Sequence, residues 1–218
     1  MRPLVLLRSE PGLSQSMARA QAAGLTAIAC PLFDVQSVAW KAPDPARYDA
    51  LLLTSANAVR HGGKELAALS ALPVHAVGDA TAEAARQAGF TVASVGSGGV
   101  DTLLATLAPG LRLISPGGED RHVPPREVDM LTVYRAAAVA DPELPTERDC
   151  VFAVHSPRAG ARLAELVIDR TDATVAAISG AAAAACGPDW REIAVAERPD
   201  DESLLALAAR LCQTSPRS

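Results

Sequence analysis

Short apolar runs alternate with amphipathic stretches along the whole chain. The runs are typical of strands buried on both faces, and the stretches have the spacing of helices that are apolar on one side. We expect strands at Pro3–Arg8, Ala27–Cys30, Ala50–Thr54, Val74–Val77, Thr91–Ser94, Leu111–Ser115, Cys150–Val154, Thr174–Ile178 and Glu192–Val195. We expect helices at Leu13–Gly24, Asn57–Leu69, Ala80–Gly89, Asp101–Leu107, Pro157–Ile168, Ala181–Gly187 and Glu202–Leu211. This order predicts an α/β protein.

The order of strand, polar turn and helix occurs twice, at an offset of 101 residues, which is the spacing of Ser55 and Ser156. Tyr48–Arg60 is echoed by Asp149–Arg162. The period is too long for a solenoid, and each copy is long enough for an independent core. The repeat therefore predicts two similar lobes, each a parallel β-sheet flanked by helices.

Two extended segments, Pro31–Val38 and Met130–Val139, do not fit the alternation of strand and helix. Both are rich in β-forming residues, so we expect them to run side by side as a two-stranded β connector. A connector of this kind creates a hinge and an interlobe cleft in which a ligand can bind. The expected parts are the connector at 31–39 and 129–139, lobe 1 at 1–30 and 140–218, and lobe 2 at 40–128.

The composition is that of an ordinary globular protein, with 49% hydrophobic and 21% charged residues. Aromatic residues make up 3% of the chain and the net charge is −5, which argues against nucleic acid as a partner. The first apolar run, Leu4–Leu7, is too short for a signal peptide or a membrane span. The chain has neither heptads nor a long apolar stripe. We therefore expect a cytoplasmic monomer that does not bind membranes.

The four cysteines are far apart and form no C-x-x-C pair, so we expect reduced, buried thiols. Metal ligands do not cluster in the sequence. The nucleophile elbow of α/β-hydrolases is absent, and His155 and Ser156 are chain neighbours, which does not by itself aim a base at the hydroxyl. Gly96-Ser97-Gly98-Gly99 lacks the lysine of a phosphate-binding loop. Hydrolase, metal and nucleotide chemistry are all disfavoured.

The polar turns after the central strands are candidates for anion binding. Thr54-Ser55-Ala56-Asn57, Gly78-Asp79-Ala80-Thr81 and Ser156-Pro157 each follow an apolar run and open a helix. Helix starts bind carboxylates and phosphates through free N–H groups and the helix dipole. The alternative is that these residues are only helix caps. Positive charge near the expected strand ends favours an anionic ligand, although about half of these arginines are expected to be solvated surface: Arg8, Arg60, His61, Arg121, His122, Arg126, Arg158 and Arg162.

Tyr134 is one of two tyrosines and lies in the expected connector. A phenol has a pKa of about 10, so it can donate a proton or hydrogen bond to a departing hydroxyl without being ionised at neutral pH. A packed strand aromatic explains Tyr134 equally well. The residues alone leave both interpretations open.

Several motifs occur in a recognisable order over most of the chain: Leu6-Leu7-Arg8, Gly24, Pro31, Leu53-Thr54-Ser55-Ala56-Asn57-Ala58-Val59, Val77-Gly78-Asp79-Ala80-Thr81-Ala82, Gly89, Val133-Tyr134-Arg135, and Phe152 through Ser156-Pro157. This order resembles the uroporphyrinogen-III synthase family. The resemblance implies two lobes, a two-stranded connector and no cofactor or metal. It also implies a lyase of porphyrin and heme biosynthesis. Such an enzyme cyclises hydroxymethylbilane, a linear tetrapyrrole with eight carboxylates, to uroporphyrinogen III, with loss of water and inversion of the last pyrrole ring.

By position, Tyr134 matches the family's connector tyrosine and is the predicted catalytic residue. The predicted substrate-binding residues are Arg8, Thr54, Ser55, Asn57, Gly78, Thr81, Arg121, Ser156 and Ser179. Two departures concern this set. Where the family usually has isoleucine-glycine and then a threonine-bearing helix start, this chain reads Ile178-Ser179-Gly180-Ala181-Ala182-Ala183, so a hydroxyl contact is missing there or moved to Ser179. Gly117–Asp129 is short and contains Pro124-Pro125 where the family usually has a helix.

Two other functions remain open at this point. A two-lobe, non-catalytic binder of an acidic small molecule would use the same duplication, hinge and helix starts. An inactive relative of the synthases would explain the altered turn at Ser179.

Overall fold

The computed structural model describes residues 1–213. It divides into two compact units: unit 1 comprises Met1–Asp34 and the chain from Ala138 onward, and unit 2 comprises Val35–Ala137. Each strand and helix expected from the sequence is present, with ends shifted by a few residues.

Unit 1 is built on a five-stranded sheet with the strand order β11-β10-β9-β1-β2 and parallel pairing throughout. The strands are β1 (Leu4–Leu6), β2 (Ala27–Ala29), β9 (Val151–Val154), β10 (Thr174–Ala177) and β11 (Glu192–Val195). The helices are α1 (Gly12–Ala22), α5 (Pro157–Leu166), α6 (Gly180–Ala185) and α7 (Asp201–Gln213). Every residue of β1, β9 and β10 is buried, which explains their uninterrupted apolar sequence.

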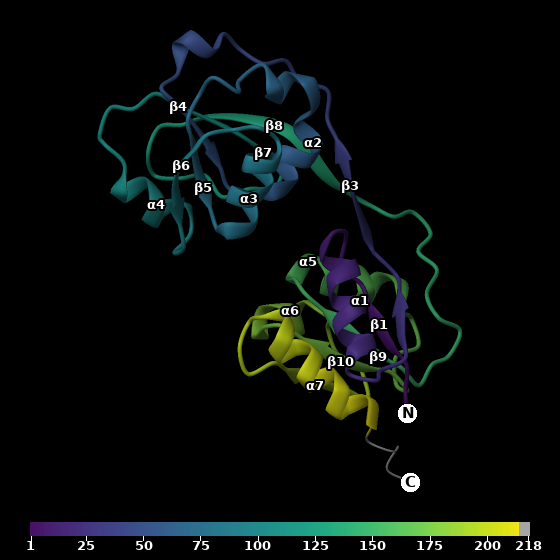
Figure 1. Cartoon of the computed structure of the whole chain (residues 1–218). Helices are drawn as coiled ribbons and strands as arrows, with labels where there is room; N and C mark the ends of the chain where they lie inside the picture. The colour runs from purple at the N-terminus through teal and green to yellow at the C-terminus, as the bar shows by residue number, and fades with distance from the viewer. Residues whose placement is uncertain (214–218) are drawn as a thin grey trace. The chain divides into compact units, whose positions relative to one another are not determined.

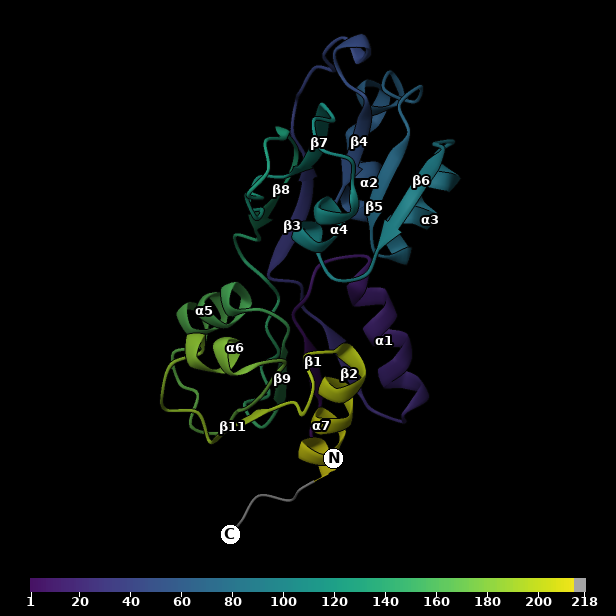
Figure 2. The same ribbon diagram turned by 90° about the vertical axis from the view of Figure 1, so that its left-hand side faces the viewer.

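The two faces of this sheet are covered by different helix pairs (Figure 2). Leu4 and Leu6 point to one face, where α1 and α7 supply apolar residues such as Leu13 and Leu204. Val5 points to the other face and joins the cluster formed by α5 and α6. The alternation of side chains along β1 therefore serves two separate cores.

Unit 2 has a six-stranded sheet with the order β3-β8-β7-β4-β5-β6 (Figure 1). Its strands are β3 (Phe33–Ser37), β4 (Ala50–Leu53), β5 (Val74–Val77), β6 (Val92–Gly96), β7 (Leu113–Gly118) and β8 (Asp129–Ala138). Its helices are α2 (Ala56–Ala67), α3 (Asp79–Gln87), α4 (Val100–Thr106) and the short 3-10 helix η1 (Pro45–Arg47). Leu51 and Leu53 pack in the cluster that contains residues of α2 and α3, whereas Leu52 packs with α4 on the opposite face.

The segments expected to form a connector lie in β3 and β8, which are neighbours in the sheet of unit 2. β8 also pairs in parallel with β7. The two segments therefore extend the sheet and do not stand apart from it.

β7 ends later than the sequence predicts. The expected strand stopped at Ser115, but pairing with β8 continues through Pro116 to Gly118, with a register shift between Gly117 and Gly118. Pro116, Gly117 and Gly118 are residue types that weaken or end strands, but pairing with β8 on one side continues the strand here. The following residues, 119–128, contain no helix, as the two prolines there favour.

In each unit, the strand order reverses at one central strand: the chain first adds a strand on one side of it and later adds a strand on the other side. From β1 the chain passes through α1 to β2 on one side, and β9 lies on the other side. From β4 it passes through α2 to β5, and β7 lies on the other side. Ligands of open parallel sheets bind at the carboxyl ends of strands at such points.

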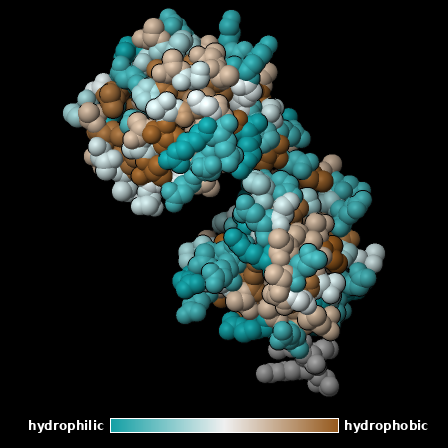
Figure 3. All heavy atoms as spheres, in the orientation of Figure 1, coloured by the Kyte–Doolittle hydropathy of each residue, from teal (hydrophilic) through white to brown (hydrophobic). Residues whose placement is uncertain are grey.

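On the face of each unit that is visible in Figure 3, hydrophobic residues are mixed with hydrophilic ones. The large hydrophobic residues that are exposed include Val95, Val123, Ile168 and Val195. They come from different elements and loops. Among residues 1–213, no helix combines the length and apolar composition needed to cross a bilayer.

A close helix contact in unit 1 leads to a stability prediction. A Cβ at Gly160 of α5 would lie 2.7 Å from the carbonyl oxygen of Ala182 and 3.0 Å from the sulfur of Cys186, both of which pack from the α6 side. Because the nearer atom is backbone, we expect Gly160→Ala to lower the free energy of unfolding of unit 1 by about 1–3 kcal/mol in chemical denaturation.

Gly180→Ala is the matched control on α6, because a Cβ there has nothing within 4 Å. We expect it to leave the stability unchanged or to raise it slightly, since alanine favours helix. Equal destabilisation by both variants would contradict the close approach of α5 and α6.

Candidate functional site

In unit 2, the carboxyl end of β4 carries the first group of predicted site residues. Ser55 caps α2, and its Oγ accepts a hydrogen bond from the N–H of Asn57 at 3.2 Å. The side-chain oxygen of Asn57 accepts from Arg60 at 3.2 Å. Thr54 lies between the end of β4 and this cap and is half-buried. The turn therefore presents polar groups and one cation at a helix start, which suits an anion.

The next turn, between β5 and α3, is built on Gly78. Its φ of 82° is favourable only for glycine, and it serves as the N-cap of α3 without a side-chain hydrogen bond. Thr81 is 5% exposed and belongs to the interior. A direct side-chain contact of Thr81 with a ligand would need movement, and its place in the site stays a prediction.

Tyr134 lies on β8 directly opposite Gly118 of β7. A Cβ at Gly118 would lie 2.9 Å from two ring carbons of Tyr134 and 3.1 Å from its hydroxyl oxygen. The phenol therefore packs against the backbone of Gly118, in space that the Cβ of any other residue would occupy. This contact fixes the hydroxyl near the carboxyl end of β7.

Arg121 lies beside this pair, and its guanidinium binds backbone. Nη1 donates to the carbonyl of Gly118 and, at 3.1 Å, to the carbonyl of Leu131. Burial lowers the pKa of Arg121, and the nearby Tyr134 partly opposes this effect. Arg121 thus joins the end of β7 to β8, and direct substrate binding by Arg121 stays a prediction.

His61 of α2 forms the other side of the Tyr134 environment. The two ring centroids are 5.9 Å apart and the planes are inclined by 40°. Nδ1 of His61 lies 3.2 Å from Oγ of Ser37 on β3. Burial, with a smaller contribution from Arg60, lowers the pKa of His61, so the imidazole is neutral at neutral pH.

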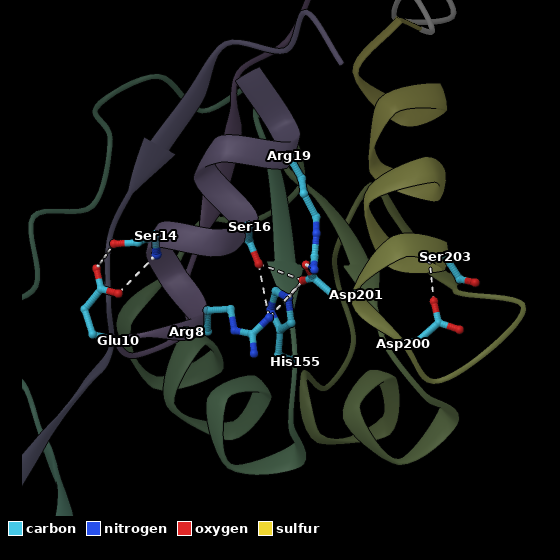
Figure 4. A network of polar contacts seen from close by, with 9 residues as sticks. All are labelled: Arg8, Glu10, Ser14, Ser16, Arg19, His155, Asp200, Asp201 and Ser203. Carbon is cyan, nitrogen blue, oxygen red and sulfur yellow. Dashed lines mark hydrogen bonds and ion pairs between the residues drawn. The ribbon is translucent and has the colours of Figure 1, made fainter. Parts of the chain in front are cut away.

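In unit 1, Arg8 follows β1 and belongs to a polar network (Figure 4). One carboxylate oxygen of Asp201 accepts hydrogen bonds from Arg8 at 2.9 Å and from Ser16 at 2.7 Å, and it lies 2.9 Å from Nε2 of His155. Arg19 donates to the other oxygen. The network joins the end of β1, α1, the end of β9 and the start of α7.

Burial and hydrogen bonding act in opposite directions on Asp201, whose side chain is 13% exposed. Burial raises its pKa, but hydrogen bonds from Ser16, His155 and Arg19 and the charge of Arg8 prevail and lower it to about 2. Burial, with the charge of Arg8, lowers the pKa of His155, although its hydrogen bond to Asp201 acts in the opposite direction. At neutral pH the network therefore contains an ionised carboxylate and a neutral imidazole.

Ser156 and Ser179 are N-caps in unit 1, as Ser55 is in unit 2. Their Oγ atoms accept from the N–H groups of Ala159 at 3.1 Å and Ala182 at 3.3 Å. The capping role that the sequence left open is thus present at all three serines. A hydroxyl that accepts in a cap keeps its own proton for donation, so capping does not remove these residues from a binding site.

The structure brings the predicted residues together in two groups. One, at the carboxyl edge of the unit 2 sheet, comprises Thr54, Ser55, Asn57, Gly78, Thr81, Arg121 and Tyr134. The other, at the carboxyl edge of the unit 1 sheet, comprises Arg8, Ser156 and Ser179. Within the part of the chain that the structure describes, no group of three or more His, Cys, Asp or Glu is placed to hold a metal ion. All four cysteines are buried and free of disulfides.

A family model described as "Uroporphyrinogen-III synthase HemD" matches residues 14–206. The chain belongs to the uroporphyrinogen-III synthase family. The expected membership is therefore confirmed, and with it a place among enzymes of porphyrin and heme biosynthesis that act on a tetrapyrrole.

Solved structures of other members of the uroporphyrinogen-III synthase family share the fold. The crystal structure of uroporphyrinogen-III synthetase from Helicobacter pylori is 17% identical, with a TM-score of 0.69, over 97% of this chain and 100% of that one. A mutant uroporphyrinogen III synthase from Thermus thermophilus is 20% identical, with a TM-score of 0.50, over 99% and 100% of the two chains. No curated protein matched the chain. These likenesses confirm the α/β fold with two parallel sheets flanked by helices.

Several polar residues beside the two groups were not predicted from the sequence of this synthase family member. Asp201 is far from Arg8 and Ser16 in the sequence, so no local motif indicates their network. His61 was noted only as a positive group, although its spacing of four residues from Asn57 places both on one side of α2. That spacing is the signal that could have identified it.

The pKa of Asp201 predicts how acid affects unit 1. Its folded value of about 2 lies below the ordinary value of 3.8. The carboxylate therefore stabilises the fold fully above the unfolded value, by about 2 kcal/mol, and this contribution is lost as the pH falls towards 2. We expect Asp201→Asn to lower the free energy of unfolding by about that amount at neutral pH, and the difference from the unchanged protein to shrink in acid.

Asp200→Asn is the matched control. Asp200 accepts from the N–H of Ser203 at 2.7 Å as a helix cap, and asparagine caps helices about as well as aspartate. We expect a smaller loss of stability in this variant than in Asp201→Asn. A pH-independent effect of Asp201→Asn, measured by denaturant unfolding across the acid range, would show that the carboxylate is not held in this way.

Proposed function

We propose that this chain is a uroporphyrinogen-III synthase that converts hydroxymethylbilane to uroporphyrinogen III, with loss of water and inversion of the last pyrrole ring. We further propose that it is a lyase that needs no cofactor. The observation that carries the proposal is the position of Tyr134 in a member of this family: its phenol rests on Gly118 at the carboxyl end of parallel strands.

The reaction requires a proton at the departing oxygen. In our proposal, the phenol of Tyr134 donates this proton to the terminal hydroxyl as the carbon–oxygen bond breaks, so that the hydroxyl leaves as water. The electron pair of the neighbouring pyrrole stabilises the carbon that remains. A proton is released when the new carbon–carbon bond is complete and aromaticity returns, so the phenol is restored. General acids positioned in this way contribute about 10²–10⁴-fold.

The substrate's negative charge is matched by groups present in each unit. Unit 2 offers the start of α2 with Asn57 and Arg60, and unit 1 offers the cap of α5 at Ser156. Helix starts favour carboxylates through their N–H groups and dipoles. Arg8 contributes charge, although its guanidinium also binds Asp201. These features support binding of a polyanion by several modest contacts.

The enzyme's main task in this proposal is orientation. Without a protein the bilane closes to the uninverted isomer, so a catalyst must hold the chain in the geometry that leads to inversion. Holding reacting groups in one geometry removes a large entropic part of the barrier. The expectations of a cytoplasmic location, a monomeric state and no nucleic-acid partner stay predictions.

An isomer assay tests the proposed reaction. Purified protein is incubated with freshly generated hydroxymethylbilane, and the oxidised porphyrin isomers are separated by chromatography. We expect a large excess of isomer III over a reaction without protein. Isomer I alone would contradict the proposal and favour a non-catalytic binder or an inactive relative.

Tyr134→Phe tests the catalytic role. Because only the hydroxyl is removed, we expect turnover to fall by about 10²–10⁴-fold, with thermal unfolding nearly unchanged. Tyr48→Phe is the matched control, since Tyr48 is the other tyrosine and donates to Asp129 at 2.6 Å near the amino ends of the unit 2 strands. Equal turnover in the two variants would remove Tyr134 from the mechanism.

Gly118→Ala tests the position of the phenol. The added Cβ would lie 2.9 Å from the Tyr134 ring, so the ring must move. We expect kcat to fall about tenfold or more, because small displacements of a catalytic group are costly. In the Tyr134→Phe background the same substitution should lower kcat much less. Full additivity of the two effects would show that Gly118 acts independently of Tyr134.

A further inference from the structure

The imidazole of His61 contacts the ring of Tyr134, and the proposed reaction has not yet given it a role. Both residues lie in unit 2, so their contact belongs to a single compact body. His61 is half-buried and therefore remains accessible from one side. It is also one turn of helix after Asn57, in the segment that opens at the Ser55 cap.

Backbone features hold His61 in place. α2 is interrupted two residues after it, because Gly63 has a φ of 59° that leaves the helical region. The indole of Trp40 donates to the carbonyl of Gly62 at 3.1 Å. From β3, Ser37 Oγ lies 3.2 Å from Nδ1 of the imidazole. The backbone after His61 is therefore anchored by Trp40, and the ring itself lies between two contacts, Ser37 and Tyr134.

The charged and titratable groups around His61 favour its neutral form. Arg60 precedes it on α2, and Tyr134 faces it from β8. Arg121, at the end of β7, is the cation next to Tyr134. Within residues 1–213, no carboxylate forms an ion pair with His61 that would favour the imidazolium. The uncharged imidazole of His61 thus lies beside Tyr134, the phenol that acts in the proposed reaction.

We propose that His61 is a positioning and specificity residue for Tyr134: it holds the phenol on Gly118 and places an imidazole at the phenol, where a lysine or arginine would add a second permanent cation to Arg121. The proposal rests on the proposed function. Arg121 is already a cation beside Tyr134, and its Nη1 donates to the backbone carbonyls of Gly118 and Leu131. A second cation at the position of His61 would strengthen the attraction for the carboxylates of the polyanionic substrate, whereas the reaction needs the uncharged hydroxymethyl end at the phenol. A neutral imidazole offers a flat surface to that end and no attraction for a carboxylate.

The charge of His61 therefore predicts a pH dependence. Its pKa lies below the ordinary value of 6.5, so the neutral form is retained at neutral pH and lost in acid. Below that pKa we expect substrate to bind with a carboxylate at the imidazolium, in an unproductive register. Unproductive binding lowers kcat and KM together and leaves kcat/KM nearly unchanged.

Three variants separate the effects. His61→Gln keeps a planar polar group that can reach Ser37 but cannot become charged, so the acid loss of kcat should disappear. His61→Lys places a permanent cation there and should lower kcat and KM by about tenfold each at neutral pH. His75→Gln is the matched control, because His75 lies on β5 of the same unit, outside the proposed site, and its Nδ1 likewise lies near a serine hydroxyl, 2.7 Å from Oγ of Ser94. It should behave as the unchanged protein at every pH.

Nuclear magnetic resonance supplies a readout that is independent of turnover. The chain has four histidines, and His61 is assigned by the signal missing in His61→Gln. We expect the pKa measured for His61 to equal the pKa of the acid limb of kcat. Ser37→Ala removes the hydroxyl at Nδ1 and should move both values in the same direction and by the same amount. Thermal unfolding of each variant checks that the fold is kept.

The outcomes are distinguishable. If the unchanged protein forms isomer III but His61→Gln retains the full acid limb, the role of His61 is overturned while the proposed function stands. Unchanged kcat and KM in His61→Lys would overturn it as well. If the unchanged protein forms only isomer I at every pH, the proposed function fails and this inference fails with it. A shared pKa that is lost in His61→Gln supports the proposal.

Discussion

Burial of the central strands on both faces is the constraint on which the rest of this structure depends. Every residue of β1, β4, β9 and β10 is buried. Polar side chains placed along these strands would lack water and most partners. The chemistry is therefore confined to the strand ends and to the helix starts that follow them. Arg8 and His155 in one unit and Thr54 in the other all occupy such ends.

Confinement to the edges makes single residues serve two purposes. Ser55, Ser156 and Ser179 each satisfy a backbone N–H of the helix that they begin. The same position exposes the unused hydroxyl proton and the remaining N–H groups to a ligand. Stability and binding thus depend on the same serines, which explains why a cap and an anion contact cannot be told apart from the sequence.

The elements were predictable because apolar periodicity is a local property. Leu4–Leu7 and Cys150–Val154 are continuous apolar runs, and each contains a central strand. The extension of β7 through Pro116 was not predictable, since it depends on pairing with β8. Contacts between residues that are far apart in the sequence could not be predicted for the same reason. Tyr134 was identified as a candidate, but its support by Gly118 and its contact with His61 arise only when β7, β8 and α2 are assembled.

Unit 1 is assembled from both ends of the chain, with unit 2 inserted between β2 and β9. During synthesis, the strands of unit 2 all leave the ribosome before β9, which pairs with β1 in the unit 1 sheet. Domains generally fold as units as they emerge. β1 and α1 must therefore wait for α7, which follows unit 2 in the chain and brings Asp201 to Arg8. The carboxylate that completes the polar network is made after the whole of unit 2, so a chain interrupted before α7 would leave the apolar faces of β1 and α1 for chaperones to cover.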